Sequence, residues 1–383
     1  MKILIVTDQF FSANNGMTMS ARRFTEMFRK HGNEVRVVST GKQGDTPYLM
    51  DKQYMYVFEH LIDEQGMTFA KPDEEKITRA VAWADVIHFI TPFVLSKKAM
   101  MIAREMGKPY TAAFHVQPEN ITSSVHLGNA DVINNLLYTA MRDYFYQYTP
   151  HIHCPSRFIA NELEKHGYKS QLHVISNGID PDFKYEKKEK PPELKDKFVI
   201  LTTGRYSVEK RQDVLINAAK RSKYADSIKL ILAGQGPRDA YLRGLAESLP
   251  VAPTFRFFTK GELLDVIAQS DLYAHCADAE IEAMSCMEAF AGGLVPVIAD
   301  SPKSATPQFA LCPESLFAAG DPDALAERID YWIEHPTERA EAEKKYAQSA
   351  KKYGLEECAS LCEEMFRTAI EEAEAQKNGN EIK

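Results

Sequence analysis

Short runs of apolar, often β-branched residues alternate with helical patterns along the whole chain, and this alternation occurs twice. In the first half it predicts buried strands at residues 2–7, 34–40, 85–90 and 110–115, and a helix over residues 19–32. In the second half it predicts strands at residues 198–204, 228–234, 255–258, 272–276 and 295–300, and helices at 211–222 and 260–270. Apolar strands separated by helices are typical of parallel sheets covered on both faces. We therefore predict an α/β protein with two Rossmann-like, doubly wound domains.

A segment rich in Lys, Glu and Pro, residues 177–197, separates the two patterns and has the composition of a solvated linker. We place the boundary near residue 185, with a first domain over residues 1–185 and a second over 186–350. The charged C-terminal stretch, residues 351–383, is expected to form a helix that crosses back to the first domain. Two such domains joined by a hinge face each other across a cleft, at the carboxyl ends of their strands, where ligands bind.

Composition and charge narrow the classes of function. The chain has 383 residues, of which 44% are hydrophobic and 26% charged, as in a soluble globular protein. No run approaches the roughly 18 apolar residues of a spanning helix, and no signal-peptide pattern is present, so a cytoplasmic location is expected. The net charge of −8 without a basic stripe argues against nucleic acid as a partner. Residues 1–180 are neutral overall, which leaves the first half free to approach an anionic membrane.

The six cysteines include no CxxC pair. This spacing favours reduced, mostly buried thiols over a disulfide framework. Cys358 and Cys362 lie one helical turn apart, but no nearby His or Cys completes a set of metal ligands. We expect no metal site.

Gly204, Arg205 and Lys210 follow one predicted strand and precede a predicted helix. A glycine permits a tight turn there, and two cations near a helix N-terminus suit a pyrophosphate. The alternative is that both cations are ordinary solvated surface residues.

The segment "EIEAMSCMEAF" places Glu280 and Glu288 eight residues apart in an apolar setting. We expect Glu280 in a loop after a strand, and Glu288 inside a helix that starts near Ala283 and ends at Gly292. Carboxylates bind vicinal hydroxyls, and the free N–H groups of the first helical turn bind phosphate, so the segment suits a sugar nucleotide. The alternative is that Glu280 and Glu282 are simply acids at the start of the helix, where the helix dipole favours negative charge.

The chain resembles the retaining glycosyltransferases of family 4, which have the GT-B fold, over nearly its whole length. The motifs that carry the resemblance occur in the family's order: residues 11–38, 154–168, 172–180, 204–210 and 280–300. The resemblance implies transfer of a hexose from a nucleotide sugar, with retention of configuration and with neither a bound metal nor a cofactor. We expect a UDP-sugar as the co-substrate.

The resemblance also assigns roles to individual residues. It implies catalytic roles for four residues: His115, Arg205, Lys210 and Glu280. It implies donor binding by eight: Gly16, Gly204, Arg205, Lys210, Glu280, Ala283, Met284 and Glu288. Glu282 and Ala283 depart from the family pattern, since many members have Phe and Gly there, so this loop must form without a glycine's conformational freedom.

Residues 114–148 are aromatic and amphipathic, and the first domain of this fold normally binds the acceptor. Leu136, Leu137, Met141, Phe145 and Tyr148 recur at helical spacing, which places them either in the core or against a lipid chain. The stretches "QPEN" and "EIEAMSCMEAF" resemble bacterial diacylglycerol glucosyltransferases, and a basic helix is predicted at residues 94–108. We therefore expect a lipid acceptor and a peripheral position on the inner membrane face. Two alternatives remain: a soluble transferase acting on a cell-wall, capsule or small-molecule glycan, and a non-catalytic nucleotide-sugar-binding subunit.

Overall fold

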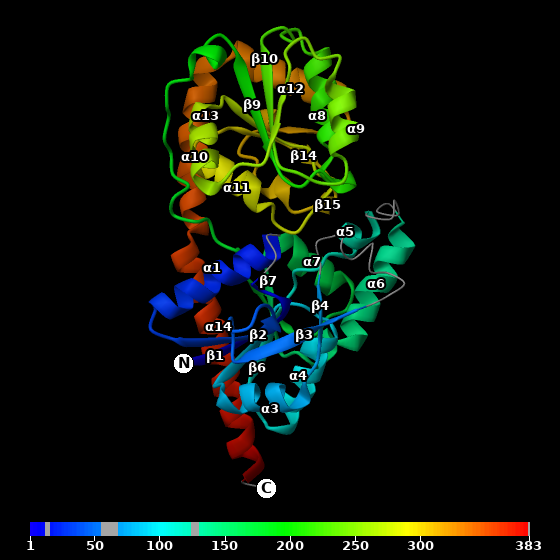
Figure 1. Ribbon diagram of the computed structural model, residues 1–383, viewed down its shortest axis with the longest axis vertical. Coiled ribbons are helices and arrows are strands. Elements are labelled where there is room, and N and C mark those ends of the chain that lie inside the picture. Colours follow the sequence, from blue (N-terminus) through cyan, green and yellow to red (C-terminus); the bar gives the residue numbers. More distant parts are fainter. Residues whose placement is uncertain (12–15, 55–67, 124–129, 382–383) are drawn as a thin grey trace. The chain divides into compact units, whose positions relative to one another are not determined.

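The computed structural model describes residues 1–11, 16–54, 68–123 and 130–381, with side chains described as far as residue 378. The chain forms two compact α/β units (Figure 1). Unit 1 comprises Met1–Pro118, Ala130–Gly178 and Leu355–Lys383; unit 2 comprises Glu119–Asn129 and Ile179–Gly354. The predicted α/β class with two doubly wound sheets is confirmed. The change of unit falls between Gly178 and Ile179, whereas the sequence places the boundary near residue 185.

Eight strands of the described residues form one sheet in unit 1, in the order β4-β3-β2-β1-β5-β6-β7-β8. Neighbours are parallel except for the antiparallel pair β3 and β4. All four strands predicted from the first half are present. The strands are β1 (Lys2–Gln9), β2 (Glu34–Thr40), β3 (Tyr48–Gln53), β4 (Phe69–Lys71), β5 (Val86–Phe89), β6 (Tyr110–Ala113), β7 (His151–Cys154) and β8 (Gln171–Val174).

Helices surround this sheet. They are α1 (Gly16–Lys30), α3 (Glu74–Trp83), α4 (Val94–Glu105), α6 (Asp131–Tyr144), α7 (Arg157–Lys165) and α14 (Leu355–Glu381), with the short helix η1 (Tyr146–Tyr148). The short helix α5 (Pro118–Ser123) belongs, from Glu119 on, to unit 2. Asp73 and Ser156 begin α3 and α7, because each side chain accepts a hydrogen bond from a backbone N–H of the first turn.

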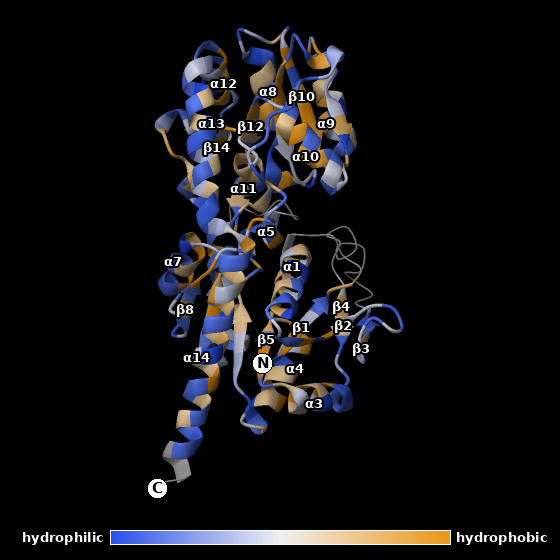
Figure 2. Ribbon diagram, turned by 90° about the vertical axis from the view of Figure 1, so that its left-hand side faces the viewer, coloured by the Kyte–Doolittle hydropathy of each residue, from blue (hydrophilic) through white to orange (hydrophobic). Residues whose placement is uncertain are grey.

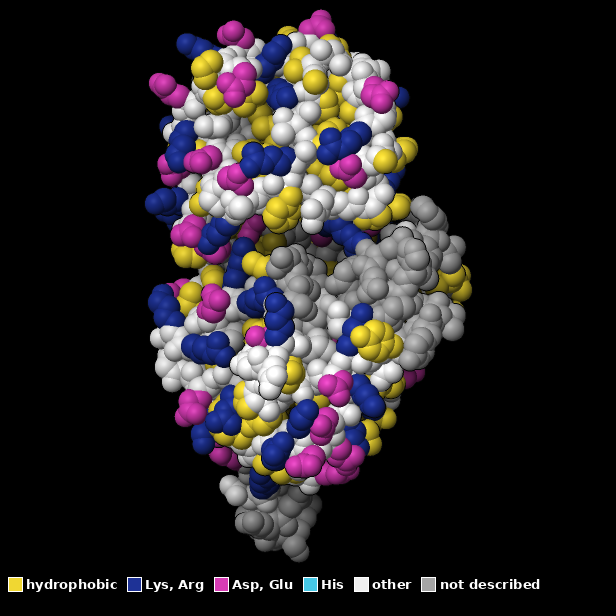
Figure 3. Space-filling view, viewed as in Figure 1, with side chains coloured by type: hydrophobic (Ala, Val, Ile, Leu, Met, Phe, Trp, Pro, Cys, Tyr) yellow, Lys and Arg dark blue, Asp and Glu magenta, His cyan; other side chains and the backbone are white. Residues whose placement is uncertain are grey.

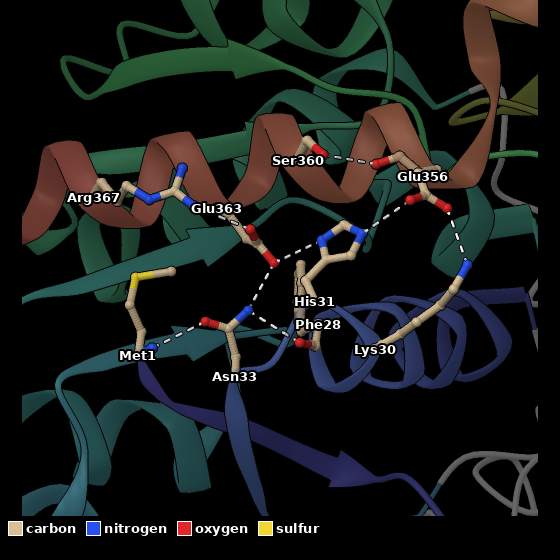
Figure 4. Close-up of polar contacts among 9 residues, drawn as sticks. All are labelled: Met1, Phe28, Lys30, His31, Asn33, Glu356, Ser360, Glu363 and Arg367. Carbon is tan, nitrogen blue, oxygen red and sulfur yellow. Dashed lines mark hydrogen bonds and ion pairs between the residues drawn. The ribbon is translucent and has the colours of Figure 1, made fainter.

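The last helix, α14, packs against α1 within unit 1, and Figure 4 shows the polar contacts that hold it. The buried Glu363 carboxylate accepts hydrogen bonds from Asn33 Nδ2 (2.8 Å) and Arg367 Nη2 (3.2 Å), and it lies 3.0 Å from Nδ1 of His31. The Met1 ammonium donates to Asn33 Oδ1 (3.0 Å). These contacts tie the last helix to the beginning of the chain.

Six parallel strands form the main sheet of unit 2, in the order β11-β10-β9-β12-β14-β16, and all five strands predicted from the second half are among them. They are β9 (Phe198–Thr203), β10 (Ile228–Ala233), β11 (Thr254–Arg256), β12 (Leu272–His275), β14 (Pro296–Asp300) and β16 (Leu316–Ala318). The short strands β13 (Ala279–Glu280) and β15 (Lys303–Ser304) pair separately. The helices are α8 (Gln212–Arg221), α9 (Asp239–Ala246), α10 (Lys260–Gln269), α11 (Met284–Ala291), α12 (Pro322–Glu334) and α13 (Pro336–Ala350).

The predicted linker is exposed over most of residues 181–189, but three of its residues are anchored to unit 2. Ile179 and Phe183 belong to the apolar core of unit 2, and Lys190 pairs with Asp271. The lysines and prolines of this segment dominate its composition, but two apolar side chains among them suffice to fix its path on the unit.

Two of the points where the chain passes between the units, after Gly178 and after Gly354, are bonded to each other. Ile179 N donates to Tyr353 O (2.6 Å), and Ile179 forms a parallel bridge with Gly354. Gly178 has a φ of +78°, and a Cβ there would lie 2.7 Å from Leu355 Cα. Only glycine fits this position, because any side chain would strain the backbone and collide with the neighbouring passage.

Apolar residues fill the strands in both units, and polar residues cover the outward faces of the helices (Figure 2). On the face shown in Figure 3, basic and acidic side chains are interspersed over unit 2. Within the described residues, no helix combines the length and the apolar character that crossing a membrane requires.

Candidate functional site

The strand order of unit 2 reverses between β9 and β12, because the chain continues from β9 to β10 on one side while β12 lies on the other. Such a switch point opens a crevice at the carboxyl ends of its two strands, where ligands of doubly wound sheets bind. Gly204 directly follows β9, and β12 ends at His275 five residues before Glu280. The predicted residues of unit 2 therefore gather at the location where this kind of sheet places its ligand.

The central feature of the site is a buried ion pair. The Lys210 ammonium donates a hydrogen bond to Oε1 of Glu280. Nε2 of His275 lies 3.4 Å from the same oxygen. Glu280 is held on β13, whose pairing with β15 is extended by a hydrogen bond from Ala305 N to Glu280 O (2.9 Å). A small strand pair thus fixes the carboxylate against the cation.

Both members of the pair are charged. Burial alone would raise the pKa of Glu280, but the Lys210 ammonium and a hydrogen bond from His275 outweigh burial and lower it to about 2. For Lys210, burial lowers the pKa, and the carboxylates of Glu280 and Glu209 overcome this effect, so the net shift is upward. The site therefore holds a cation and an anion throughout the physiological pH range.

Helix α11 begins one residue after the position where many family members have glycine. Its N-cap, Ala283, has the left-handed backbone conformation, with φ of +66° and ψ of +64°. The loop thus keeps the glycine-type turn although the residue is alanine, at a cost of about 1–2 kcal/mol. The predicted helix from Ala283 to Gly292 is confirmed. The alternative that Glu280 and Glu282 are acids of its first turn is wrong, because α11 has no acid there and Glu280 lies on β13.

The start of α11 faces the ion-pair region through Tyr273. The Tyr273 hydroxyl lies 3.1 Å from Ser285 Oγ and 3.4 Å from Thr203 O, so it links β9, β12 and the first turn of α11. Cys286 N and Met287 N both bond to Ala283 O, which leaves Met284 N and Ser285 N as first-turn donors without a backbone acceptor in the described residues. Two N–H groups are therefore available to an anion.

The remaining predicted residues of unit 2 occupy different depths. Glu288 lies buried in α11, just over one turn from the helix start, and Glu282 is buried before it. Arg205 is partly exposed, and its backbone oxygen accepts hydrogen bonds from Gln212 Nε2 (2.8 Å) and Ser207 N (3.0 Å). The backbone at Arg205 is thereby fixed while its side chain extends from a defined turn.

Gly16 and His115 belong to unit 1. Gly16 is the first residue of α1, and a Cβ there would meet no atom of the chain within 4 Å. Residues 12–15, the rest of the predicted glycine loop, lie outside the described residues. His115 follows β6 at its carboxyl end, as the sequence predicts.

His115 lies in a cluster of histidine rings. Its ring is perpendicular to that of His153, at a centroid distance of 5.5 Å, and His153 is stacked on His88 at 6.2 Å. Burial, followed by repulsion from His153, lowers the pKa of His115 to about 3. Burial likewise lowers the pKa of His153, to about 4. His115 is therefore a neutral imidazole at physiological pH, able to form hydrogen bonds but carrying no charge.

The apolar residues of the amphipathic segment, residues 114–148, were expected either in the core or against a lipid chain, and they are found both buried and exposed. Phe145 is fully buried, but Leu136 is 64% exposed and Tyr148 is also exposed. On α6 the buried side chains are Asn134 and Tyr138, while Val132, which was not part of the predicted stripe, is 74% exposed. A single apolar stripe packed on the core is therefore wrong: α6 keeps apolar side chains on its outer face.

The six cysteines are free, and five of them are buried, as predicted. No group of three or more His, Cys, Asp or Glu side chains in the described parts of the chain has the arrangement of a metal site.

The sequence interpretation missed His275, which contacts the Glu280 carboxylate. Its signal was present, because His275 is the last residue of a predicted strand at the carboxyl edge of the sheet. It also missed Arg211, which has a left-handed backbone and pairs with Asp278 at 3.0 Å, linking the loops after β9 and β12. A left-handed arginine has no recognisable sequence signal.

Two family models match the chain, and together they span most of it. Residues 183–353 match the family model "Glycosyl transferases group 1", and residues 14–183 match "Glycosyltransferase Family 4". An alpha-monoglucosyldiacylglycerol synthase of Streptococcus pneumoniae is 26% identical, over 92% of this chain and 84% of its own length. A GDP-mannose-dependent alpha-mannosyltransferase of Corynebacterium glutamicum is 26% identical, over 78% of this chain and 72% of its own.

Among solved structures, Anabaena Alr3699/HepE in complex with UDP-glucose superposes with a TM-score of 0.70, at 17% identity, over 95% of this chain and 99% of its own. This likeness shows the shared fold. The two family models together span residues 14–353, and the chain belongs to the family 4 glycosyltransferases, which have the GT-B fold.

Proposed function

We propose that the protein is a retaining, metal-independent transferase that moves glucose from UDP-glucose to a lipid acceptor of the diacylglycerol type. The observation that carries the proposal is the buried, charged pair of Lys210 and Glu280 at the switch point of unit 2. An ammonium at this position suits the charge of a departing diphosphate, and a carboxylate suits sugar hydroxyls. The choice of glucose and diacylglycerol rests on the pneumococcal relative, which matches 92% of this chain.

In this proposal the ion pair is the resting arrangement, and the donor exchanges its partners. Lys210 turns to the diphosphate, together with Arg205 and the free N–H groups at the start of α11. Glu280 is released to accept hydrogen bonds from the sugar, and Glu288 binds the ribose. Gly16 leaves room for the backbone of unit 1 to approach the donor. Because Lys210 and the helix start supply positive charge, no metal ion is required for the leaving group.

The neutral state of His115 restricts its role. With a pKa of about 3, the imidazole holds the transferred sugar by a hydrogen bond and does not act as an acid. We assign the acceptor's proton to an oxygen of the leaving phosphate. Retention is supported by the names of both curated relatives, which specify alpha transfer, since nucleotide sugars of glucose and mannose are themselves α-linked.

The lipid acceptor is supported by the outer face of α6. Val132 and Leu136 are 74% and 64% exposed there, and large apolar side chains grouped on a surface mark binding sites. Near the end of the same helix, the Lys97 ammonium lies 3.8 Å from the Tyr148 ring centroid and 5.4 Å from that of Tyr144. Apolar, aromatic and cationic side chains on one surface suit the headgroup region of an anionic membrane.

The second candidate is transfer of mannose from GDP-mannose to a water-soluble glycan. It is favoured by the mannosyltransferase relative, which has the same identity to this chain as the glucosyltransferase, although over less of it. A binding protein without turnover is disfavoured, because both family models describe transferases.

The test is release of nucleoside diphosphate by the purified protein with EDTA present, from UDP-glucose and from GDP-mannose. Each donor is supplied with phosphatidylglycerol vesicles that do or do not contain diacylglycerol. Release from UDP-glucose that requires diacylglycerol supports the whole proposal. Release from GDP-mannose alone would replace the donor, release indifferent to diacylglycerol would remove the lipid, and loss of activity in EDTA would contradict metal independence.

Membrane contact is tested separately by co-sedimentation with the same vesicles. The variant Val132→Ser/Leu136→Ser should bind less, and Leu311→Ser, an exposed apolar residue of unit 2, is the matched control. Equal binding by all three proteins would exclude the outer face of α6.

A further inference from the structure

A second concave site lies wholly within unit 1. Its cavity has a volume of ≈ 830 Å³, within the size range of small-molecule sites. The floor is formed by the residues that lead into β6, β7 and β8, including Pro109, Thr149 and Ser170. Glu372 and Lys377 of α14 form part of the wall.

This cavity is at the opposite edge of the sheet from His115. Strands β6, β7 and β8 are parallel, and the cavity is at their amino ends, whereas His115 follows the carboxyl end of β6. Four strand residues, about 13 Å of extended chain, separate the two ends. A ligand in the cavity therefore does not compete with a sugar held at His115.

The cavity is lined by five basic side chains and one acidic side chain. Two of the basic residues have structural roles: Lys108 Nζ donates to Ala82 O (3.0 Å) and Ala84 O (2.6 Å), and Arg142 Nη1 donates to His166 O (2.7 Å). Both therefore bind the carbonyl groups at helix ends, as cations commonly do.

The other three cations lack such an explanation. Within the described residues, Arg104, Lys169 and Lys377 have no carboxylate partner. Arg104 packs only on the Tyr148 ring, with its guanidinium carbon 5.0 Å from the centroid. The single acid, Glu372, is directed to His151, at 3.2 Å from Nε2. The lining of the cavity therefore carries a net positive charge, with Glu372 as its single counter-charge.

The pKa of the neighbouring Lys97 is lowered in part by this excess of positive charge. Burial is the first cause that lowers its pKa, and repulsion from Arg104 is the second. A cation that destabilises the charged form of its neighbour gains more from an anionic ligand than an isolated cation does.

We propose that this cavity is a binding site for a phosphate ester, held by Arg104, Lys169 and Lys377 on the face of unit 1 remote from His115. Guanidinium and ammonium groups together are suited to phosphate oxygens. The volume exceeds that of one phosphate group, so the ligand carries further atoms that contact Tyr110, Gln147 and Tyr148. The phosphate comes either from a soluble metabolite or from a phospholipid headgroup, and both present the same group.

The test measures lysine reactivity in the full chain. The protein is treated with an amine-acetylating reagent, and each lysine is quantified by mass spectrometry. The probes are inorganic tripolyphosphate, phosphatidylglycerol vesicles and phosphatidylcholine vesicles, at constant ionic strength in chloride. No UDP is added, because UDP is itself a phosphate ester, and Lys210 is quantified alongside to report occupancy of the donor site. Protection of Lys169 and Lys377 by about threefold or more is expected, with no change at the exposed Lys195 of unit 2.

The two probes separate the sources of phosphate. Protection by tripolyphosphate assigns the site to a soluble ester, and protection by phosphatidylglycerol but not phosphatidylcholine assigns it to a headgroup. Protection that is lost in Arg104→Gln, and kept in the exposed control Arg79→Gln on α3, confirms that the cavity holds the probe. Unchanged reactivity of both lysines with both anionic probes would overturn the proposal. Failure of UDP-glucose turnover would leave this result untouched, because the readout does not depend on transfer.

Discussion

The two units treat their buried ionisable groups in opposite ways. Unit 2 keeps Lys210 and Glu280 charged by pairing them, and the pKa of Glu280 is held at about 2. Unit 1 keeps His88, His115 and His153 neutral, because burial without a carboxylate lowers the pKa of each. A charged pair can stabilise developing charge, whereas a neutral cluster can only shape a pocket and donate or accept hydrogen bonds.

This difference matches a division of labour between donor and acceptor. A diphosphate brings negative charge and needs a cation, while a hydroxyl acceptor and a neutral sugar need neither. In the proposed function, therefore, unit 2 stabilises the charge of the donor, and unit 1 provides neutral contacts. Substitutions in the two units should differ in effect accordingly.

The largest effect is expected from Lys210→Ala. It removes the cation and leaves the Glu280 carboxylate buried without its main partner, so transfer should fall about 10³-fold, or roughly 4 kcal/mol of transition-state stabilisation. The matched substitution in unit 1, His115→Ala, should cost about tenfold to a hundredfold, since it removes a neutral hydrogen bond. Steady-state kinetics of both variants measure the two losses of transfer rate. Equal losses would refute the proposed difference between the units.

Acid should weaken unit 1 before unit 2. Unfolded histidines bind protons below about pH 6.5, while burial lowers the pKa of the native His115 to about 3 and that of His153 to about 4, and it lowers the pKa of His88 as well. The unfolded state then binds more protons, so stability falls as pH drops, by up to about 1.4 kcal/mol per pH unit and histidine. Asp8 opposes this trend, because burial raises its pKa to about 6 and the native state is the one that takes up its proton. In unit 2, the lowered pKa of Glu280 stabilises the native state, and this stabilisation is lost only below about pH 4.5.

The chain offers a probe for each unit. Trp83 lies in unit 1 and Trp332 in unit 2, so Trp332→Phe and Trp83→Phe variants report one unit each by fluorescence. Denaturant titrations between pH 7 and about pH 5 should show a larger loss with Trp83 as the probe. The same loss with either tryptophan would mean that the units unfold together and that the contrast is invisible to stability.

Glu280→Gln should separate binding from transfer. Without the carboxylate, Lys210 is no longer neutralised, so UDP should bind more tightly, by about threefold to tenfold. Transfer should nevertheless fall about tenfold to a hundredfold, because the amide is a weaker acceptor for sugar hydroxyls. Isothermal titration with UDP is the measurement, and Glu247→Gln, an exposed carboxylate elsewhere on unit 2, is the control. Weaker UDP binding would refute the exchange of partners by Lys210.

Glu363→Gln tests whether the negative charge of Glu363 stabilises unit 1 through its contacts with His31, Asn33 and Arg367. The amide keeps the shape but turns one acceptor oxygen into a donor group facing Asn33 and His31 (Figure 4). The free energy of unfolding should fall by about 1–3 kcal/mol. Thermal unfolding measures it, and Glu364→Gln, the exposed neighbour on α14, should change it little. If Glu363→Gln were as stable as the control, the charge of Glu363 would not contribute to the stability of unit 1.

The smallest effect is expected from Ala283→Gly. Glycine relieves the left-handed strain but adds disorder to the unfolded chain, and the two terms nearly offset, for a net change below about 1 kcal/mol. The donor KM should stay the same, because the loop already has the glycine-type conformation. A large fall in KM would show that Ala283 restrains the loop during donor binding.

The sequence was most informative where the pattern of residues and the physics coincide. Apolar runs such as those of β1 and β9 predict buried parallel strands, and Glu288 lies in the predicted helix, whereas Glu280 lies on the short strand β13 where a loop was expected. Strands β7 and β8 were not predicted, because "HIHC" and "QLHV" carry histidines that read as polar.

Other features depended on contacts that composition cannot express. The packing of Ile179 and Phe183 was hidden among lysines, and the outward face of α6 was hidden because an apolar residue looks the same whether it faces the core or solvent. The left-handed Ala283 and Arg211 follow from their surroundings and not from their own preferences.

The double passage between the units, at Gly178 and at Gly354, has a consequence for biosynthesis. Unit 1 is discontinuous, and its core includes Phe366 and Met365 of α14, which the ribosome makes only after the whole of unit 2. Residues 1–118 and 130–178 must therefore wait with part of their core uncovered while residues 179–354 of unit 2 are synthesised and fold. The half of the molecule that is translated first is the half that is completed last.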